Sequence, residues 1–141
     1  MTLFERAIDS PVATMPSLSV AASPDQLRVL RAFVRAVAIP HALAVGDLDD
    51  LILAADEAAA TLMSHALPFS ALQCTVDIDT QDLRMILAAT TSAAIDTSTT
   101  SFSWFILQRL VDGVVLEQIP TGAPGNWTTT IIVDKALQAG L

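Results

Sequence analysis

The sequence is poor in the residues that build metal and redox sites. Cys74 is its only cysteine, which excludes an internal disulfide and a cysteine-based zinc site. His41 and His65 are its only histidines, too few for a histidine-rich metal site. Seven basic residues stand against fifteen acidic ones, which gives a net charge of −8. Because proteins bind duplex DNA by neutralising its phosphates, this balance argues against a nucleic-acid partner. The acidity either serves solubility or suits a basic protein partner.

Long apolar runs are also missing. No run approaches the length that spans a bilayer, and the start carries Glu5 and Asp9 with no apolar stretch behind them. We therefore expect no signal peptide, no membrane helix and a cytoplasmic location. What the chain does have is 52% hydrophobic and only 16% charged residues among its 141. That balance predicts one folded domain with a sizeable core.

Two segments have the apolar spacing of amphipathic helices. The first begins at Ser23-Pro24, since proline suits the first helical position, and ends before Pro40. The second runs from Gly46 to about Ala66. Apolar residues recur every three or four positions at Leu27, Leu30, Val34 and Val37 in the first, and at Leu48, Leu51, Ile52, Ala55, Ala59 and Leu62 in the second.

Three of the seven basic residues line one stripe of the first predicted helix. Arg28, Arg31 and Arg35 stand at positions i, i+3 and i+7, away from the apolar positions. Such a stripe is either a solvated helix face or a docking surface for acidic groups of a partner. Like charges at this spacing repel slightly, and a partner's carboxylates would remove that repulsion.

The remaining pattern predicts strands and one more helix. The strands are expected at 17–22, 72–78, 83–87, 114–119 and 127–133, with a hairpin between the second and third. Thr90 to Ser103 is rich in serine, threonine and alanine and predicts a mobile loop before a helix that ends at Leu110. Cys74 then lies in a strand as a buried small hydrophobe.

This order predicts a two-layer α/β sandwich, with helices on one face of a mixed or antiparallel sheet. The domain is expected to span 17–135, after a loosely ordered lead-in over 1–16 and before a tail over 136–141.

The order of elements and three local sequences resemble the RsbW family of anti-sigma factors and serine-protein kinases, which have the GHKL ATPase fold. Leu27 to Val34 is similar to the family's opening helix, which commonly carries an arginine near Arg31. Phe102 to Val114 is similar to the late helix and turn of the divergent actinobacterial anti-sigma factors. The resemblance implies regulation of transcription in a stress response, a sigma factor and an anti-anti-sigma factor as partners, and a homodimer. A mean hydropathy of +0.55 fits a buried interface between copies.

The segment Leu51 to Pro68 resembles the family's nucleotide-site helix but departs from it at the metal position. Glu57 matches the family's candidate general base, and His65-Ala66 matches its later His-Ala pair. The family's asparagine that holds Mg²⁺ is replaced by Thr61. Glu57 is therefore either a remnant of the catalytic site or a solvent-facing helix glutamate.

The family's other nucleotide motifs are also altered. Its Asp-x-Gly motif, which reads adenine, corresponds to Ala88 to Asp96, and its glycine-rich lid to Thr97 to Ser103. Neither stretch contains a glycine. Phosphoryl transfer needs metal-bridged phosphates and donors placed around them. The resemblance with these changes implies a degenerate nucleotide site and no required cofactor.

Three functions remain open from the sequence. The first is an anti-sigma factor that inhibits a sigma factor by protein contacts, with Arg28, Arg31 and Arg35 as its docking residues and Arg31 as first choice. The second is an active ATP- and Mg²⁺-dependent serine kinase that phosphorylates an anti-anti-sigma factor. The third is a two-layer sandwich of unrelated function.

Overall fold

The chain is described by a computed structural model over residues 15–97 and 101–138. Every element predicted from the sequence is present. In chain order these are β1 (Ser17–Ala21), the 3-10 helix η1 (Pro24–Gln26), α2 (Leu27–Ala38), α3 (Asp47–Met63), β2 (Ala71–Ile78), β3 (Asp82–Thr91), α4 (Ser101–Leu110), β4 (Gly113–Pro120) and β5 (Trp127–Ala136). Among the described residues, no helix is long and apolar enough to cross a membrane.

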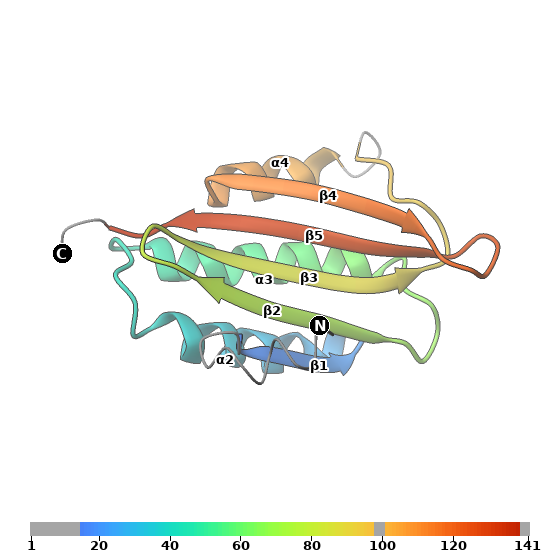
Figure 1. Cartoon of the computed structure of the whole chain (residues 1–141), viewed down its shortest axis with the longest axis horizontal. Coiled ribbons are helices and arrows are strands. Elements are labelled where there is room, and N and C mark those ends of the chain that lie inside the picture. Colours follow the sequence, from blue (N-terminus) through green and yellow to red (C-terminus); the bar gives the residue numbers. More distant parts are fainter. Residues whose placement is uncertain (1–14, 98–100, 139–141) are drawn as a thin grey trace, which may run out of the picture.

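The strands form one sheet in the order β1-β2-β3-β5-β4, and each neighbouring pair is antiparallel. Figure 1 shows this sheet in front of the helices, which lie together behind it. The predicted two-layer α/β sandwich is therefore confirmed, and its sheet is antiparallel rather than mixed. The predicted hairpin joins β2 to β3. The Asp79 carboxylate closes its turn by accepting hydrogen bonds from the N–H groups of Gln81 (2.7 Å) and Asp82 (2.8 Å).

The core lies between the helices and one face of the sheet. Alternate residues of the central strands point into it, which is why their sequences alternate. Helix α3 lies at its centre and packs against α2, α4 and β3. Its side facing the core is largely alanine, which lets its backbone approach its neighbours closely. The fully buried core residues of α3 and the strands include Leu51, Ala54, Ala55, Ala58, Ala59, Leu62, Leu72, Leu83, Met85, Leu87 and Ile131.

Cys74 is part of this core, as the sequence predicted. Its side chain is fully buried in β2, and burial raises the pKa of its thiol to about 12. The thiol therefore stays protonated near neutral pH, and Cys74 acts as a small apolar side chain.

Two predicted segments have different bounds in the structure. The loop expected from Thr90 begins later, because β3 pairs with β5 as far as Thr91, and it ends earlier, because α4 begins at Ser101. The tail expected from Ala136 is held for three residues. Ala136 ends β5, the Leu137 N–H donates to the Gln81 carbonyl (2.7 Å), and the Gln138 N–H donates to the Ala42 carbonyl (2.8 Å).

The predicted lead-in over 1–16 falls mostly outside the described residues. Of its last two residues, Pro16 is bonded to the sheet, because the Val76 N–H donates to its carbonyl (2.9 Å).

Candidate functional site

Helix α2 presents its arginines to solvent. Its buried side consists of Leu30, Val34 and Ala38, while Arg28, Arg31 and Arg35 are all exposed. A second exposed row, apolar and at helical spacing, runs beside the arginines: Val29, Ala32, Ala36 and Ile39. Arginine is enriched at protein interfaces, and exposed apolar side chains beside it offer area that a partner can remove from water. We call these seven residues the α2 face.

Arg31 differs from the other two arginines because it is already paired. Its Nη1 donates to Oδ2 of Asp56 on α3 at 2.8 Å, and the two side chains are 44% and 26% exposed. The second oxygen of Asp56, Oδ1, is buried and has no hydrogen-bond partner. Replacing Arg31 would therefore leave a half-buried carboxylate without its counter-ion. Arg28 and Arg35 are the better residues for testing partner binding, since neither has a partner of this kind among the ion pairs of the described residues.

The predicted nucleotide-site residues lie along one row of α3. Glu57 is half-buried and Thr61 is buried, 7% exposed. The Thr61 hydroxyl donates to the Glu57 carbonyl of its own helix at 2.9 Å. One turn later, Nδ1 of His65 lies 3.0 Å from the Thr61 carbonyl and 2.9 Å from the Ser64 hydroxyl. The Thr61 hydroxyl and the His65 ring thus both lie within hydrogen-bonding distance of backbone carbonyls of α3.

The segment after β3, for which the sequence resemblance predicted a counterpart of the adenine-reading motif, is folded onto the protein. Ile95 is 3% exposed and belongs to the hydrophobic core. The side-chain amide of Gln118 on β4 holds its backbone on both sides: the Ile95 N–H donates to Oε1 (2.6 Å), and Nε2 donates to the Ile95 carbonyl (3.0 Å). We call this arrangement the Ile95–Gln118 clamp. These contacts argue against the mobile loop that the sequence predicted for this segment, and residues 98–100 lie outside the described part of the chain.

Two threonines form a hydrogen bond next to the clamp. The hydroxyls of Thr91 and Thr129 are hydrogen bonded to each other at 2.8 Å in a buried site, and Thr91 also donates to the Ala93 carbonyl (3.0 Å).

Two hollows lie elsewhere on the surface, one of about 280 Å³ on the open sheet face and one of about 250 Å³ beside Val111 to Val114. Neither is lined by Glu57 or Thr61.

Removal of the Gln118 amide should loosen this segment. In Gln118→Ala, both backbone groups of buried Ile95 lose their partner, so local opening should become easier by about 1–3 kcal/mol. Amide exchange of the peptide spanning Thr91 to Thr97 should then be faster by about fivefold to 100-fold, since 1.4 kcal/mol is a factor of ten. Gln108→Ala, an exposed glutamine on α4, is the control. Equal exchange in both variants would show that the clamp does not hold the segment.

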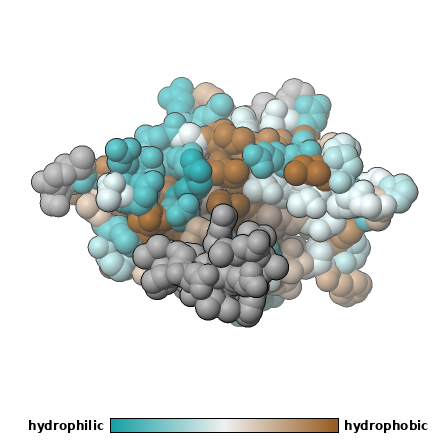
Figure 2. Space-filling view, in the orientation of Figure 1, coloured by the Kyte–Doolittle hydropathy of each residue, from teal (hydrophilic) through white to brown (hydrophobic). Residues whose placement is uncertain are grey.

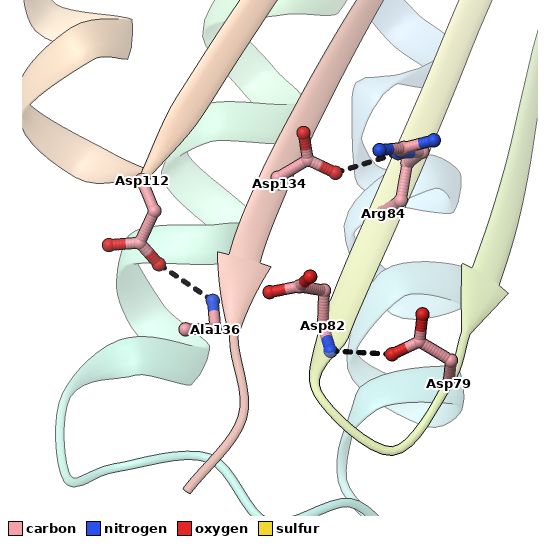
Figure 3. A network of polar contacts seen from close by, with 6 residues as sticks. All are labelled: Asp79, Asp82, Arg84, Asp112, Asp134 and Ala136. Atoms are coloured by element: carbon pink, nitrogen blue, oxygen red, sulfur yellow. Dashed lines mark hydrogen bonds and ion pairs between the residues drawn. The ribbon is translucent and has the colours of Figure 1, made fainter.

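A second polar cluster lies at one end of the sheet and is structural (Figure 3). Asp112 accepts a hydrogen bond from the Ala136 N–H (2.6 Å), and Nε of Arg84 donates to Asp134 (2.7 Å), whose hydrogen bond raises the pKa of the guanidinium. Hydrogen bonds from the backbone of Asp82 and Gln81 lower the pKa of Asp79. No group of three or more metal-ligating side chains occurs within the described ranges.

The fold occurs in a known structure. The crystal structure of the RsbU and RsbW domains of Rv1364c from Mycobacterium tuberculosis matches with a TM-score of 0.57 at 16% identity, over 88% of this chain. The match covers 34% of that chain, so this protein spans about a third of its length. The likeness confirms the predicted GHKL-type fold. No protein-family model matches the sequence, and no curated protein matches it.

The sequence named every arginine of the α2 face but missed its apolar row. Val29, Ala32, Ala36 and Ile39 were visible as residues at helical spacing, outside the stripe assigned to the core. The clamp carried no such signal, because Ile95 and Gln118 are 23 positions apart and meet only through the sheet. Glu57 and Thr61 do lie on one helix row, as the resemblance implied.

Proposed function

We propose that this protein acts as an anti-sigma factor, which binds an RNA polymerase sigma factor in the cytoplasm through the α2 face. An anti-anti-sigma partner would release it. The observation that carries the proposal is the α2 face itself, where three exposed arginines stand beside an exposed apolar row. Sigma factors enter through the sequence resemblance to the RsbW family, and the shared fold supports that resemblance.

The physical case for binding rests on charge as well as composition. The protein has a net charge of −8, yet α2 contains three arginines and no acidic residue. Guanidinium groups form charge-assisted and often bidentate hydrogen bonds with carboxylates. The apolar row would supply the area that a partner removes from water, with Val29 39% and Ile39 58% exposed in the free chain. A partner with an acidic, partly apolar helix face matches both rows.

Two features support a function that does not depend on nucleotide. Thr61 stands at the position where the family holds Mg²⁺, and its hydroxyl donates a hydrogen bond to the helix backbone. Ile95 is packed into the core where the family's adenine-reading segment runs. Phosphoryl transfer needs a positioned metal and phosphates, so Glu57 alone cannot perform it.

Exposure to Mg-ATP should therefore give no signal. We expect no binding heat by calorimetry at millimolar nucleotide, and no transfer of labelled phosphate to a serine of a co-purified anti-anti-sigma partner. The control is Glu57→Ala, which removes the candidate base while leaving the α2 face unchanged. Phosphate transfer by the natural protein that disappears in Glu57→Ala would establish the kinase alternative instead.

The partner is tested by affinity capture from the native cell followed by direct binding. The captured proteins are identified by mass spectrometry, and the purified sigma subunit is then titrated against the natural protein and the Arg28 and Arg35 variants. Direct binding that weakens in those variants supports the proposal. If the captured protein is not a sigma factor but binds through the α2 face, the α2 face remains the binding surface and the sigma factor is rejected as its partner.

A further inference from the structure

Strands β1 and β4 are the two edges of the sheet, and only one of them is protected (Figure 1). β1 has five residues and follows Pro16, and proteins commonly protect an edge with a short strand or a proline. β4 has eight residues, and its only proline is the last, Pro120. Within residues 15–97 and 101–138, no backbone group forms a hydrogen bond to the outer side of β4. β4 is therefore an edge to which an extended segment of another protein can add as a strand.

The β4–β5 hairpin shows which backbone groups of β4 point outward. The Thr121 N–H donates to the Asn126 carbonyl at 2.9 Å. Along an antiparallel pair, residues bonded to the partner strand alternate with residues whose N–H and C=O point away from it. Pro120 therefore has its backbone nitrogen on the outer side, where a missing N–H removes no bond to β5. By the same alternation, the outward N–H and C=O groups belong to Val114, Leu116 and Gln118.

The side chains beside this edge alternate between the two faces of the sheet. Ile131 and Val133 of β5 are fully buried on the core side, so the residues that alternate with them lie on the open face, opposite the helices. Their partners on β4 are Val115, Glu117 and Ile119, and all three are exposed, Val115 by 48% and Ile119 by 62%. In Figure 2, which views the open face, hydrophobic and hydrophilic residues alternate where Figure 1 places β4. An added strand thus meets an apolar, an acidic and an apolar side chain in turn.

Charge decides which kind of segment fits this edge. Glu117 is the one charged residue of β4, and side chains across neighbouring strands attract or repel each other according to their charge. A second copy paired edge to edge about the centre of β4 would bring the two Glu117 carboxylates opposite or diagonal to each other on one face. The net charge of −8 also repels an acidic segment. A segment with a lysine or arginine beside Glu117 has neither disadvantage.

We propose that β4 binds an extended, basic segment of another protein as a sixth strand, antiparallel to β4. The segment places a lysine or arginine beside Glu117, and β-branched or aromatic residues beside Val115 and Ile119. Its backbone exchanges hydrogen bonds with the outward groups of β4. The antiparallel direction is chosen because it is slightly more stable per residue than the parallel one. This surface is separate from the α2 face, since α2 packs against α3 and β1 and lies at the other edge of the sheet.

The start of β4 has space for such a segment. A hollow of about 250 Å³ lies between the end of α4 and the first residues of β4, and it is lined by Gln108, Val111, Asp112, Gly113 and Val114. The Val114 side chain packs on the core side, so the residue of the segment beside it also points to that side, toward the hollow. The Asp112 carboxylate in the lining favours a second basic or amide side chain there.

An NMR titration of the full chain with a synthetic peptide tests the proposal. The probe is Ser-Val-Thr-Lys-Thr-Val-Ser, blocked at both ends, which presents valine, lysine and valine on one side and reads alike in both directions. We expect a dissociation constant below about 1 mM, which corresponds to about −4.1 kcal/mol. The largest shifts should occur at the amides of Val114, Leu116 and Gln118.

N-methylation of the peptide tests the backbone contacts separately from the side chains. In the antiparallel arrangement, the threonine N–H groups point to β4 and the lysine N–H points away from it. Methyl groups on both threonine nitrogens should therefore abolish binding, because they remove the donors and block the approach to the edge. A methyl group on the lysine nitrogen should leave binding intact.

A charge exchange tests the role of Glu117. Glu117→Lys should bind the lysine peptide about twofold to 30-fold more weakly, because attraction across the strands is replaced by repulsion. The same variant should prefer a peptide in which glutamate replaces the lysine. Asp49→Lys makes the same change of charge at an exposed position of α3 and should keep the preference for the lysine peptide. Thermal melts confirm that both variants are folded.

Three results would overturn the inference. They are an absence of shifts at the β4 amides with about 5 mM peptide, well above the Kd of a millimolar complex; equal binding of the two methylated peptides; or an unchanged preference in Glu117→Lys. Arg28→Glu on the α2 face should not alter peptide binding, so this inference and the proposed function are tested independently.

Discussion

Reversal of the charges at Arg28 and Arg35 together should reduce sigma-factor affinity about 100-fold or more. Breaking one buried interfacial charge pair costs about 2–5 kcal/mol, whereas a rim contact costs about 1 kcal/mol or less. In Arg28→Glu/Arg35→Glu, two glutamates would face the partner's carboxylates, so attraction is replaced by repulsion. The measurement is the dissociation constant by calorimetry, with thermal stability recorded in parallel.

The control separates a local contact from a change of net charge. Arg109→Glu alters the charge by the same amount per substitution, but at an exposed position of α4. It should change the affinity by less than about threefold at physiological salt, where screening acts within about 8 Å. The loss in the double variant should persist at about 0.5 M salt if the pairs are buried, since buried pairs are screened much less. If high salt removes the loss of affinity in both variants, Arg28 and Arg35 belong to a solvated face and not to a binding interface.

Arg31 is unsuited to this test, which corrects the order of preference given by the sequence. The sequence placed it off the core, so its replacement was expected to leave folding unchanged. Its ion pair with Asp56 links α2 to α3, and the buried Oδ1 of Asp56 makes that carboxylate depend on it. Arg31→Glu would place a second carboxylate beside Asp56, so lost binding could not be separated from lost stability.

The fold could be predicted because its signals are local. Strands β2 and β3 alternate apolar and polar side chains around a tight turn, and α2 and α3 have apolar residues at helical spacing between prolines. The prediction was wrong where buried residues do not look apolar. The end of β3 reads as a polar loop because Thr91 is a threonine, yet its hydroxyl is satisfied inside the protein by Thr129. A buried polar pair of this kind requires knowledge of the partner strand.

The candidate site could be predicted only in part, for the same reason. Residues on one helix, such as Glu57 and Thr61, keep their spacing in any fold that preserves the helix. Contacts between elements depend on the strand order, which local patterns do not determine. The Ile95–Gln118 clamp and the Arg31–Asp56 pair both join residues more than twenty positions apart.

Among the residues that the structure describes, Lys135 is the most buried charged residue. It follows Ile131 and Val133 on the core-facing side of β5 and is only 8% exposed. Its ammonium group donates to the Leu110 carbonyl at the end of α4 (2.8 Å). The same group lies 3.5 Å from Asp47 and 3.9 Å from Asp50, in the first turn of α3. One cation thus joins the negative end of one helix, two carboxylates of another and the central sheet.

Lys135→Met should therefore be strongly destabilising although it keeps an apolar stem of similar length. The Leu110 carbonyl would lose its partner, and the carboxylates of Asp47 and Asp50 would lose their counter-ion, at a combined cost of about 2–4 kcal/mol. For a domain of this size, the midpoint temperature of thermal unfolding should then fall by roughly 10 °C. The matched control is Arg84→Met, which removes an exposed cation paired with Asp134 and should cost less than about 1 kcal/mol. Denaturant unfolding of both variants measures the difference. Similar losses would mean that Lys135 contributes no more than a surface ion pair, because Asp47 and Asp50, which are 23% and 43% exposed, recover their hydration when it is removed.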